Sequence, residues 1–307
     1  MSVRISTYGA HTALVQYMLS NESTLNAAEV QESTSSKSQT YAGLASTGLN
    51  GNVKLLVNLE SEVSYNTTLA DNANVAITKI DAISSDISSI SDVATSLKTA
   101  ISEAMSADDT ERATYQEEAS GWLSDVASTL NDTYGGQYLF GGTETDKAPV
   151  SVDSSTYPAL TSDSGSDTSY YSGTDTTASV QVSGTQSISY GVTASDPSIE
   201  KLMRALNMMA NTSPLDDDTL TTALDLVNDA SSGLSDMSQT LSISSSRIQS
   251  AVTHLNDIQT FASDQSSDIK SVDLAEVSTT VTTLQTSLEA TMQAIAASQK
   301  MSLVTYL

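Results

Sequence analysis

The sequence predicts a mainly α-helical chain in which long N- and C-terminal segments form a nested coiled-coil bundle with a small β-rich inserted outer domain. Three observations predict this class. The four prolines, Pro149, Pro158, Pro197 and Pro214, all lie in the middle of the 307-residue chain, so neither flank contains the residue that most disrupts helix interiors. Apolar residues on both flanks recur in steps of three and four. Residues 146–196 are instead rich in Ser, Thr, Asp, Gly and Tyr.

The N-terminal flank begins with a helix predicted over residues 5–35. Leu14, Met18, Leu25 and Ala28 fall on one stripe of this helix. Residues 41–52 follow with three glycines, which predicts a loop or hinge.

The strongest helical pattern covers residues 69–104. Its apolar positions alternate in steps of four and three over about five heptads, as in a coiled coil. At 1.5 Å per residue this rod is on the order of 50 Å long. It buries one narrow stripe and therefore needs partner helices. The positions are Leu69, Ala73, Ala76, Ile80, Ile83, Ile87, Ile90, Ala94, Leu97, Ile101 and Ala104.

A further helix is predicted from Ser106 to about Asp132. Ser106 is the expected N-cap, with Asp109 three residues on as in a capping box. The helix leads into residues 135–142, an aromatic run between glycine pairs that predicts a strand with tight turns. The aromatic run and its second glycine pair include Tyr138, Leu139, Phe140, Gly141 and Gly142.

The insert and the C-terminal flank follow. Alternation at 178–182 and 187–190 predicts strands. Asp196 and Pro197 suit a helix start, and residues 214–218 open another helix. Its seam comprises Leu220, Leu224, Val227, Leu234, Leu241, Ile248, Leu255 and Ile258. A final heptad segment contains Leu274, Val277, Val281, Leu284, Leu288 and Ile295.

These elements predict three nested domains. Residues 1–45 with 265–307 form a terminal paired-helix assembly domain, residues 46–145 with 197–264 form a helical inner domain with a β-hairpin, and residues 146–196 form a variable β-rich outer domain. A peripheral helix pair cannot bury both of its stripes, so we expect it to contact neighbouring subunits. The residues expected to carry assembly are Leu14, Met18, Leu25, Leu274, Val277, Val281, Leu284, Leu288 and Ile295.

Composition excludes several function classes. A net charge of −25 disfavours nucleic acid and anionic membranes, because both bind through clustered Lys and Arg. The chain has no cysteine, so neither disulfides nor Cys-ligated metals are expected. No phosphate-binding loop or nucleophile elbow is present, and residues 216–218 are interpreted as helix-capping acids rather than a metal cluster. We therefore expect no enzyme and no cofactor. The N-terminus lacks the features of an ordinary cleaved signal.

Several stretches resemble the flagellin superfamily of bacterial axial proteins, and within it the hook–filament junction proteins. The most specific is 131–142, which resembles a helix-to-hairpin signature. Residues 301–307 resemble the junction proteins' ending rather than that of filament flagellins. The matching stretches are 4–7, 110–113 with 117–118, 131–142, 272–276, 285–290 and 301–307. The segment after the first helix, residues 32–44, departs from the hinge pattern of many relatives.

The resemblance implies an extracellular structural subunit of the flagellum, exported without a cleaved signal through the flagellar type III apparatus with an export chaperone. It implies a ring of about a dozen copies of this chain between a first hook-associated junction protein and the flagellin filament. Two alternatives stay open: a filament flagellin, and a secreted adhesin or receptor-binding protein whose insert binds a glycan or a host receptor.

Overall fold

The computed structural model describes residues 2–46 and 50–304, with side chains described at 9–46 and 52–299. Within these limits the chain divides into two compact units, one from residues 1–64 and 259–307 and the other from residues 65–258. The mainly helical class is confirmed. The three-domain division stays a prediction. The side chains of residues 4–7, and residues 305–307 of the C-terminal ending, lie outside the described part.

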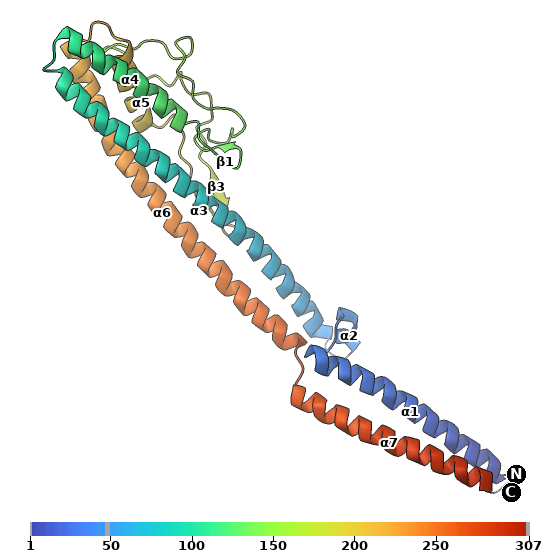
Figure 1. Ribbon diagram of the computed structural model, residues 1–307. Helices are drawn as coiled ribbons and strands as arrows, with labels where there is room; N and C mark the ends of the chain where they lie inside the picture. Colours follow the sequence, from blue (N-terminus) through green and yellow to red (C-terminus); the bar gives the residue numbers. More distant parts are fainter. Residues whose placement is uncertain (1, 47–49, 305–307) are drawn as a thin grey trace. The chain divides into compact units, whose positions relative to one another are not determined.

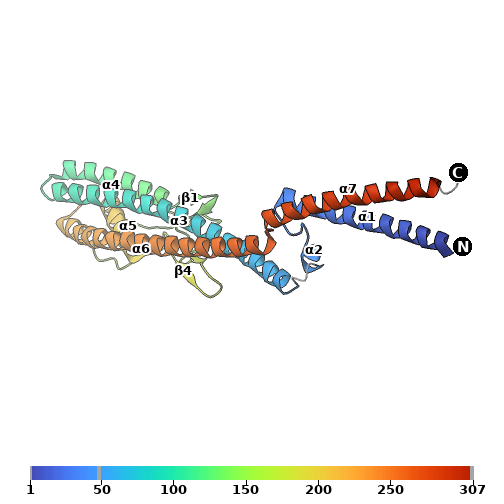
Figure 2. The same cartoon turned by 90° about the horizontal axis from the view of Figure 1, so that it is seen from below.

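The first unit contains the paired ends of the chain. Helix α1 (Ser2–Thr34) lies beside helix α7 (Leu274–Val304), as Figures 1 and 2 show. The predicted pairing of the terminal helices is therefore correct.

The loop or hinge predicted at residues 41–52 is wrong at 41–46 and from residue 50 onward, because helix α2 covers Tyr41–Ser46 and helix α3 begins at Asn50. The Gly43 N–H donates to Thr40 Oγ1 at 3.0 Å, and the Leu44 N–H donates to the Thr40 carbonyl at 3.0 Å. Leu44 is buried, which holds this short helix in place. Gly43 packs close to Ser38, and a Cβ there would require the Ser38 hydroxyl, which would lie 1.9 Å from it, to rotate. Residues 47–49 lie outside the described residues.

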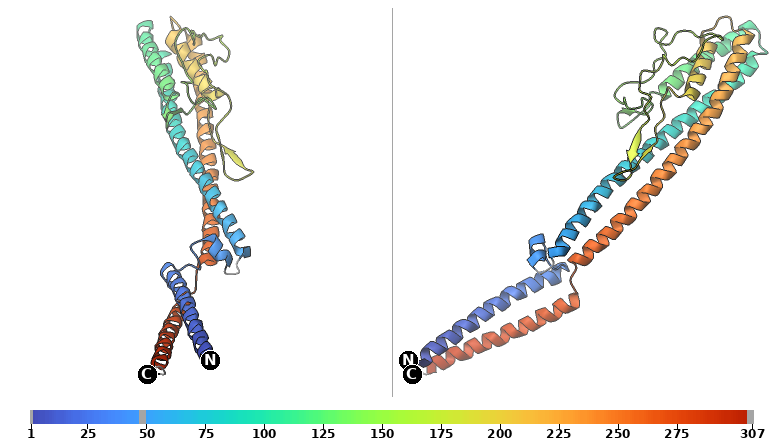
Figure 3. Two further views of the ribbon diagram at one scale, coloured as in Figure 1. Left: turned by 90° about the vertical axis from the view of Figure 1, so that its right-hand side faces the viewer. Right: turned by 180° about the vertical axis from the view of Figure 1, so that it is seen from behind.

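The second unit is built on two long antiparallel helices that also extend into the first unit. Helices α3 (Asn50–Ala104) and α6 (Asp217–Lys270) run side by side within residues 65–258 (Figure 3). The heptad positions predicted over 69–104 are all buried, and the α6 seam from Leu220 to Leu255 is buried apart from the half-buried Leu224. Helices α4 (Asp109–Thr129) and α5 (Pro197–Asn211) pack against each other and complete the bundle.

Helices α5 and α6 begin at the predicted capping residues, whereas a different residue caps α4. Asp108, not Ser106, caps α4, because its carboxylate accepts the N–H groups of Thr110 and Glu111. A carboxylate directly before the first turn also suits the helix dipole better than a more distant hydroxyl. Asp196 caps α5 as predicted, and Asp216 Oδ1 accepts the Thr219 N–H at the start of α6.

The segment between α4 and α5 is mostly irregular, with two short antiparallel hairpins. Strand β1 (Thr133–Tyr134) pairs with β2 (Gln137–Tyr138), and β3 (Ser179–Gln181) pairs with β4 (Ser187–Ser189). The strands predicted from alternation at 178–182 and 187–190 are confirmed at residues 179–181 and 187–189, and Val180 and Ile188 face each other and are buried. The predicted strand over 135–142 is correct only at Gln137 and Tyr138.

Polar side chains of α5 hold the irregular segment to the bundle. Asn207 accepts the Leu160 N–H at 2.8 Å and donates to the Pro158 carbonyl at 3.1 Å. Glu200 accepts the Asp167 N–H at 2.9 Å. Both side chains are buried, and a buried polar group that lost its partner would be strongly destabilising. These bonds give a segment with little secondary structure a fixed path.

Candidate assembly interface

The terminal pair is held by a narrow apolar seam. Leu25 and Ala28 of α1 are buried against Val277 and Val281 of α7, and Leu284, Leu288 and Val272 pack against this cluster. These α1 positions are separated by three residues and the α7 positions by four, so each helix offers one stripe. A seam of four buried apolar residues stabilises a helix pair only modestly, because it removes little apolar area from water.

Polar residues extend the seam toward the free ends of the helices. Asn21 is buried and its Nδ2 donates to Ser287 Oγ at 3.1 Å. Hydrogen bonds with Ser287 and Asn21 lower the pKa of the neighbouring Tyr17. A buried hydrogen bond of this kind favours one axial alignment of two helices over others, since any slippage leaves the amide without its partner.

The segment that follows α1 and the segment that precedes α7 are hydrogen-bonded to each other in the first unit. Ser36 and Ser271 form an antiparallel bridge, and the Lys37 N–H donates to the Lys270 carbonyl at 2.8 Å. Glu60 accepts from Lys270 Nζ and from the Tyr41 hydroxyl, and these two bonds lower its pKa. The end of α1 and the start of α7 are therefore held close together.

Apolar side chains remain exposed on the terminal pair. Leu19 is 56% exposed and Val30 is 51% exposed. They lie about three turns apart and so project from the same side of α1, roughly opposite Leu25 and Ala28. Leu274 and Met292 are exposed on α7. A helix pair with apolar residues outside its own seam is typical of an element that packs against further chains.

The structure separates the predicted assembly residues into two groups. Leu25, Val277, Val281, Leu284 and Leu288 meet in the seam within one chain. Leu14, Met18 and Ile295 are half-buried, and Leu274 is exposed. A contact of any of them with another copy stays a prediction. Leu19, Val30 and Met292 lie outside the predicted stripes, and a second apolar stripe on each helix is the sequence signal for them.

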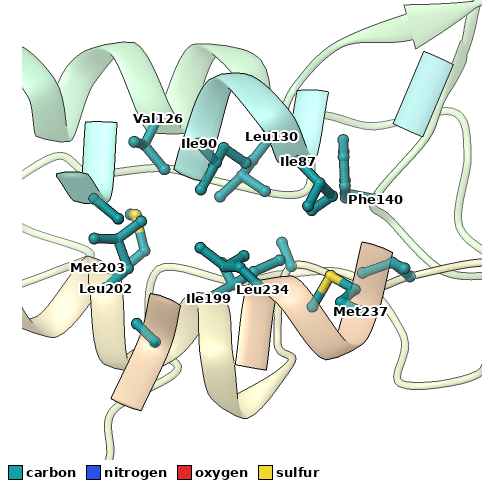
Figure 4. Packing of buried hydrophobic residues seen from close by; sticks show 14 of the residues in the cluster. Ile87, Ile90, Val126, Leu130, Phe140, Ile199, Leu202, Met203, Leu234 and Met237 are labelled. Carbon is teal, nitrogen blue, oxygen red and sulfur yellow. The ribbon is translucent and has the colours of Figure 1, made fainter. Parts of the chain in front are cut away.

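The hairpin motif has a structural place in the second unit. Phe140 is fully buried and lies beside Ile87 of α3 (Figure 4). Gly135 and Gly136 form the β1–β2 turn with φ of 60° and 79°, values that glycine adopts at little cost. A Cβ at Gly141 would lie 2.3 Å from the Glu144 carbonyl oxygen, and one at Gly142 would lie 2.1 Å from that of Thr174. The half-buried Tyr138 and Leu139 complete the motif.

Arg112 is a further key residue in the second unit that sequence reasoning left without a role. Its Nε donates to the Ala104 carbonyl at 3.0 Å and its Nη1 to the Leu215 carbonyl at 2.8 Å. Its Nη2 lies 2.7 Å from Asp217 Oδ1. One guanidinium thus joins the end of α3, the start of α4 and the start of α6, which a lysine cannot do with a single ammonium.

Other chemistry has little support in the described part of the chain. No group of three or more His, Asp or Glu side chains there is arranged to hold a metal ion. The acids at 216–218 behave as caps and ion-pair partners, since Asp216 binds Thr219 and Asp217 binds Arg112. None of the described helices has a stretch long and apolar enough to cross a bilayer.

Comparisons with known proteins agree with this architecture. The family model of the bacterial flagellin C-terminal helical region matches residues 224–307. A solved structure described as a flagellar hook-associated protein from Vibrio parahaemolyticus is 17% identical, with a TM-score of 0.59 over 71% of this chain and 96% of that chain. FlgL of Bacillus cereus is 11% identical, with a TM-score of 0.41 over 73% of this chain and 98% of that chain. Curated protein sequences give no match. The resemblance to the flagellin superfamily is confirmed.

Proposed function

We propose that this flagellin-like structural protein of the flagellum joins the hook, through a first hook-associated junction protein, to the flagellin filament. About a dozen copies would form a closed ring, as expected for identical subunits related by rotation. The chain would act outside the cell after export through the flagellar type III apparatus with its chaperone. It would need no cofactor and catalyse no reaction.

The observation that carries this proposal is the apolar surface left on the terminal helix pair. The seam between α1 and α7 is thin, and Leu19 and Val30 project away from it. Packing further helices against these side chains would bury apolar area that one chain leaves in water. The pair would therefore gain much of its stability on assembly.

Two features favour a junction subunit over a filament subunit. Residues 301–307 resemble the ending of the junction proteins rather than that of filament flagellins. The structure from Vibrio parahaemolyticus, which shares the fold, is described as hook-associated. A filament subunit remains the second candidate, because residues 224–307 match the family model of the flagellin C-terminal helical region.

A deletion strain tests the junction role directly. Electron microscopy should show hooks without filaments, and an immunoblot of the culture medium should show shed flagellin. Loss of all flagellin from cells and medium would instead identify the chain as the filament subunit. Normal filaments would contradict both roles and favour the adhesin alternative.

A substitution at Leu19 tests whether the exposed apolar side of α1 takes part in assembly. Leu19→Asp places a charge on the exposed apolar side of α1 and should abolish complementation of the deletion strain. Ser20→Asp adds the same charge about 100° further around the helix and should complement. Equal complementation by both variants would contradict an assembly role for this surface.

A further inference from the structure

The outer side of α6 carries a groove in the second unit. It has a volume of about 530 Å³ and lies between strand β4 and the middle of α6. Gln186 and Ile188 line one side, and Ile243, Arg247 and Ala251 line the other. Ile188 is buried, whereas Ile243 is 60% exposed. A large aliphatic side chain so exposed beside a groove favours a protein partner there.

The charge of this groove is unusual for the chain. Arg247 lies one turn beyond Ile243 on the same side of α6. It is exposed, and the described residues place no carboxylate within ion-pair distance of it. The chain as a whole carries a net charge of −25. The groove therefore suits a helix that offers an apolar residue together with an acid one turn away.

Helix α3 of the same protein offers this pair. Val75 is 48% exposed, and Asp71 is exposed one turn before it. In a ring every copy points the same way, and α3 and α6 run antiparallel within each copy (Figure 3). The α6 helix of one copy is thus antiparallel to the α3 helix of the next. In that orientation Asp71 meets Arg247 when Val75 meets Ile243.

We infer that the groove at Ile243 and Arg247 receives the Asp71–Val75 face of α3 from a neighbouring copy. The contact rests on the proposed ring and adds to it a second interface, separate from the terminal helices. It places an ion pair beside an apolar contact, so it selects both the partner helix and its direction. Repetition around the ring makes a contact that is weak in isolation effective in the assembly.

Cysteine cross-linking tests the pairing, because the natural chain contains no cysteine. Chains with Ile243→Cys and chains with Val75→Cys are co-expressed in the deletion strain, so that a mixed disulfide must join two copies. Oxidation of isolated hook–filament structures should give a dimer, since a disulfide needs Cβ atoms about 4 Å apart. Each single variant alone supplies the background. Thr99→Cys, exposed further along α3, replaces Val75→Cys as the matched control.

Charge exchange then tests the ion pair. Adding Arg247→Glu to the Ile243→Cys chain should reduce the dimer yield several-fold, and adding Asp71→Arg to the Val75→Cys chain should restore it. Unchanged thermal unfolding of the variants controls for misfolding.

The outcomes separate this inference from the junction role. Attached filaments without a mixed disulfide, or with one only in the Thr99→Cys control, would overturn the contact and leave the junction role intact. A disulfide-linked dimer in a strain whose deletion does not detach filaments would sustain the contact and contradict the junction role. A cross-link to a protein of another mass would overturn the choice of a second copy.

Discussion

The two compact units differ sharply in how they are stabilised. In the second unit, helices α3 to α6 and the irregular segment share one continuous apolar cluster, reinforced by buried hydrogen bonds from Asn207 and Glu200. In the first unit, the terminal pair has four buried apolar residues and one buried amide between its helices. Stability that comes from apolar burial follows the area removed from water. The second unit therefore has a large apolar core of its own within one chain, whereas we expect the terminal pair to gain stability from neighbouring copies.

Phe140→Ala should lower the stability of the second unit more than any other substitution considered below. It empties the site beside Ile87 in the second unit (Figure 4) and should destabilise the chain by about 3–5 kcal/mol. Calorimetry should show the main unfolding transition at a much lower Tm. Tyr134→Ala in the same hairpin, where the side chain is exposed, is the control and should change stability by less than about 0.5 kcal/mol.

Arg112→Ala should destabilise the second unit by about 2 kcal/mol, because the carbonyls of Ala104 and Leu215 lose their donor. Denaturant unfolding measures the loss. Asp217→Asn should cost far less, since the Asp217 side chain is largely exposed and surface ion pairs contribute little. Equal losses in the two variants would show that the ion pair, not the carbonyl contacts, carries the stability.

Asp86→Asn should change how stability depends on pH. Burial, with a smaller contribution from Asp132, raises the pKa of Asp86 to about 6, above its ordinary value near 4. The folded chain therefore binds this proton more tightly than the unfolded chain, so stability should rise as pH falls from 7 through 6 toward 4. The variant should lose this contribution and melt a few degrees higher at pH 7. Parallel pH profiles of Tm in both proteins would contradict the assignment.

Leu284→Asp should have the smallest effect on stability and a large effect on assembly. Leu284 packs on the thin seam of the terminal pair, so the main unfolding transition should shift by less than about 0.5 kcal/mol. Filament attachment should nevertheless be lost when the variant replaces the wild-type chain. Gln285→Asp, an exposed neighbour, should support attachment. Filament growth on hooks that carry only the Leu284→Asp chain would refute the seam's role.

The sequence predicted the long helices because their physical cause is local and periodic. The heptads over 69–104 repeat every few residues, and the aspartate–proline helix start at 196–197 occupies two adjacent residues, so both patterns can be read from short stretches of sequence. The same holds for the alternation that predicted strands at 178–182 and 187–190; the pairing of Val180 with Ile188 is known only from the structure. The nested pairing of the terminal helices followed from the two stripes, and the structure bears it out.

The misses arise where distant residues decide local structure. Gly43 was interpreted as a loop residue, but the hydrogen bonds to Thr40 and the burial of Leu44 hold a short helix there. The path of residues 158–167 depends on Asn207 and Glu200 from a later helix, and no local pattern reveals those bonds. Of the candidate interface, the seam was visible from single stripes. Leu19 and Val30 form a second apolar stripe that is also present in the sequence, but only the structure shows that α7 leaves this side of α1 exposed.

The bridge between Ser36 and Ser271 also indicates the order in which parts of the chain fold. It joins positions separated by most of the chain, and closing so long a flexible loop costs about 5 kcal/mol of chain entropy. Folding of residues 65–258 shortens the loop that remains to be closed. The bridge should therefore form after that folding, and the terminal helices should pair last. A chain that folds in this order leaves its terminal helices unpaired until residues 65–258 have folded.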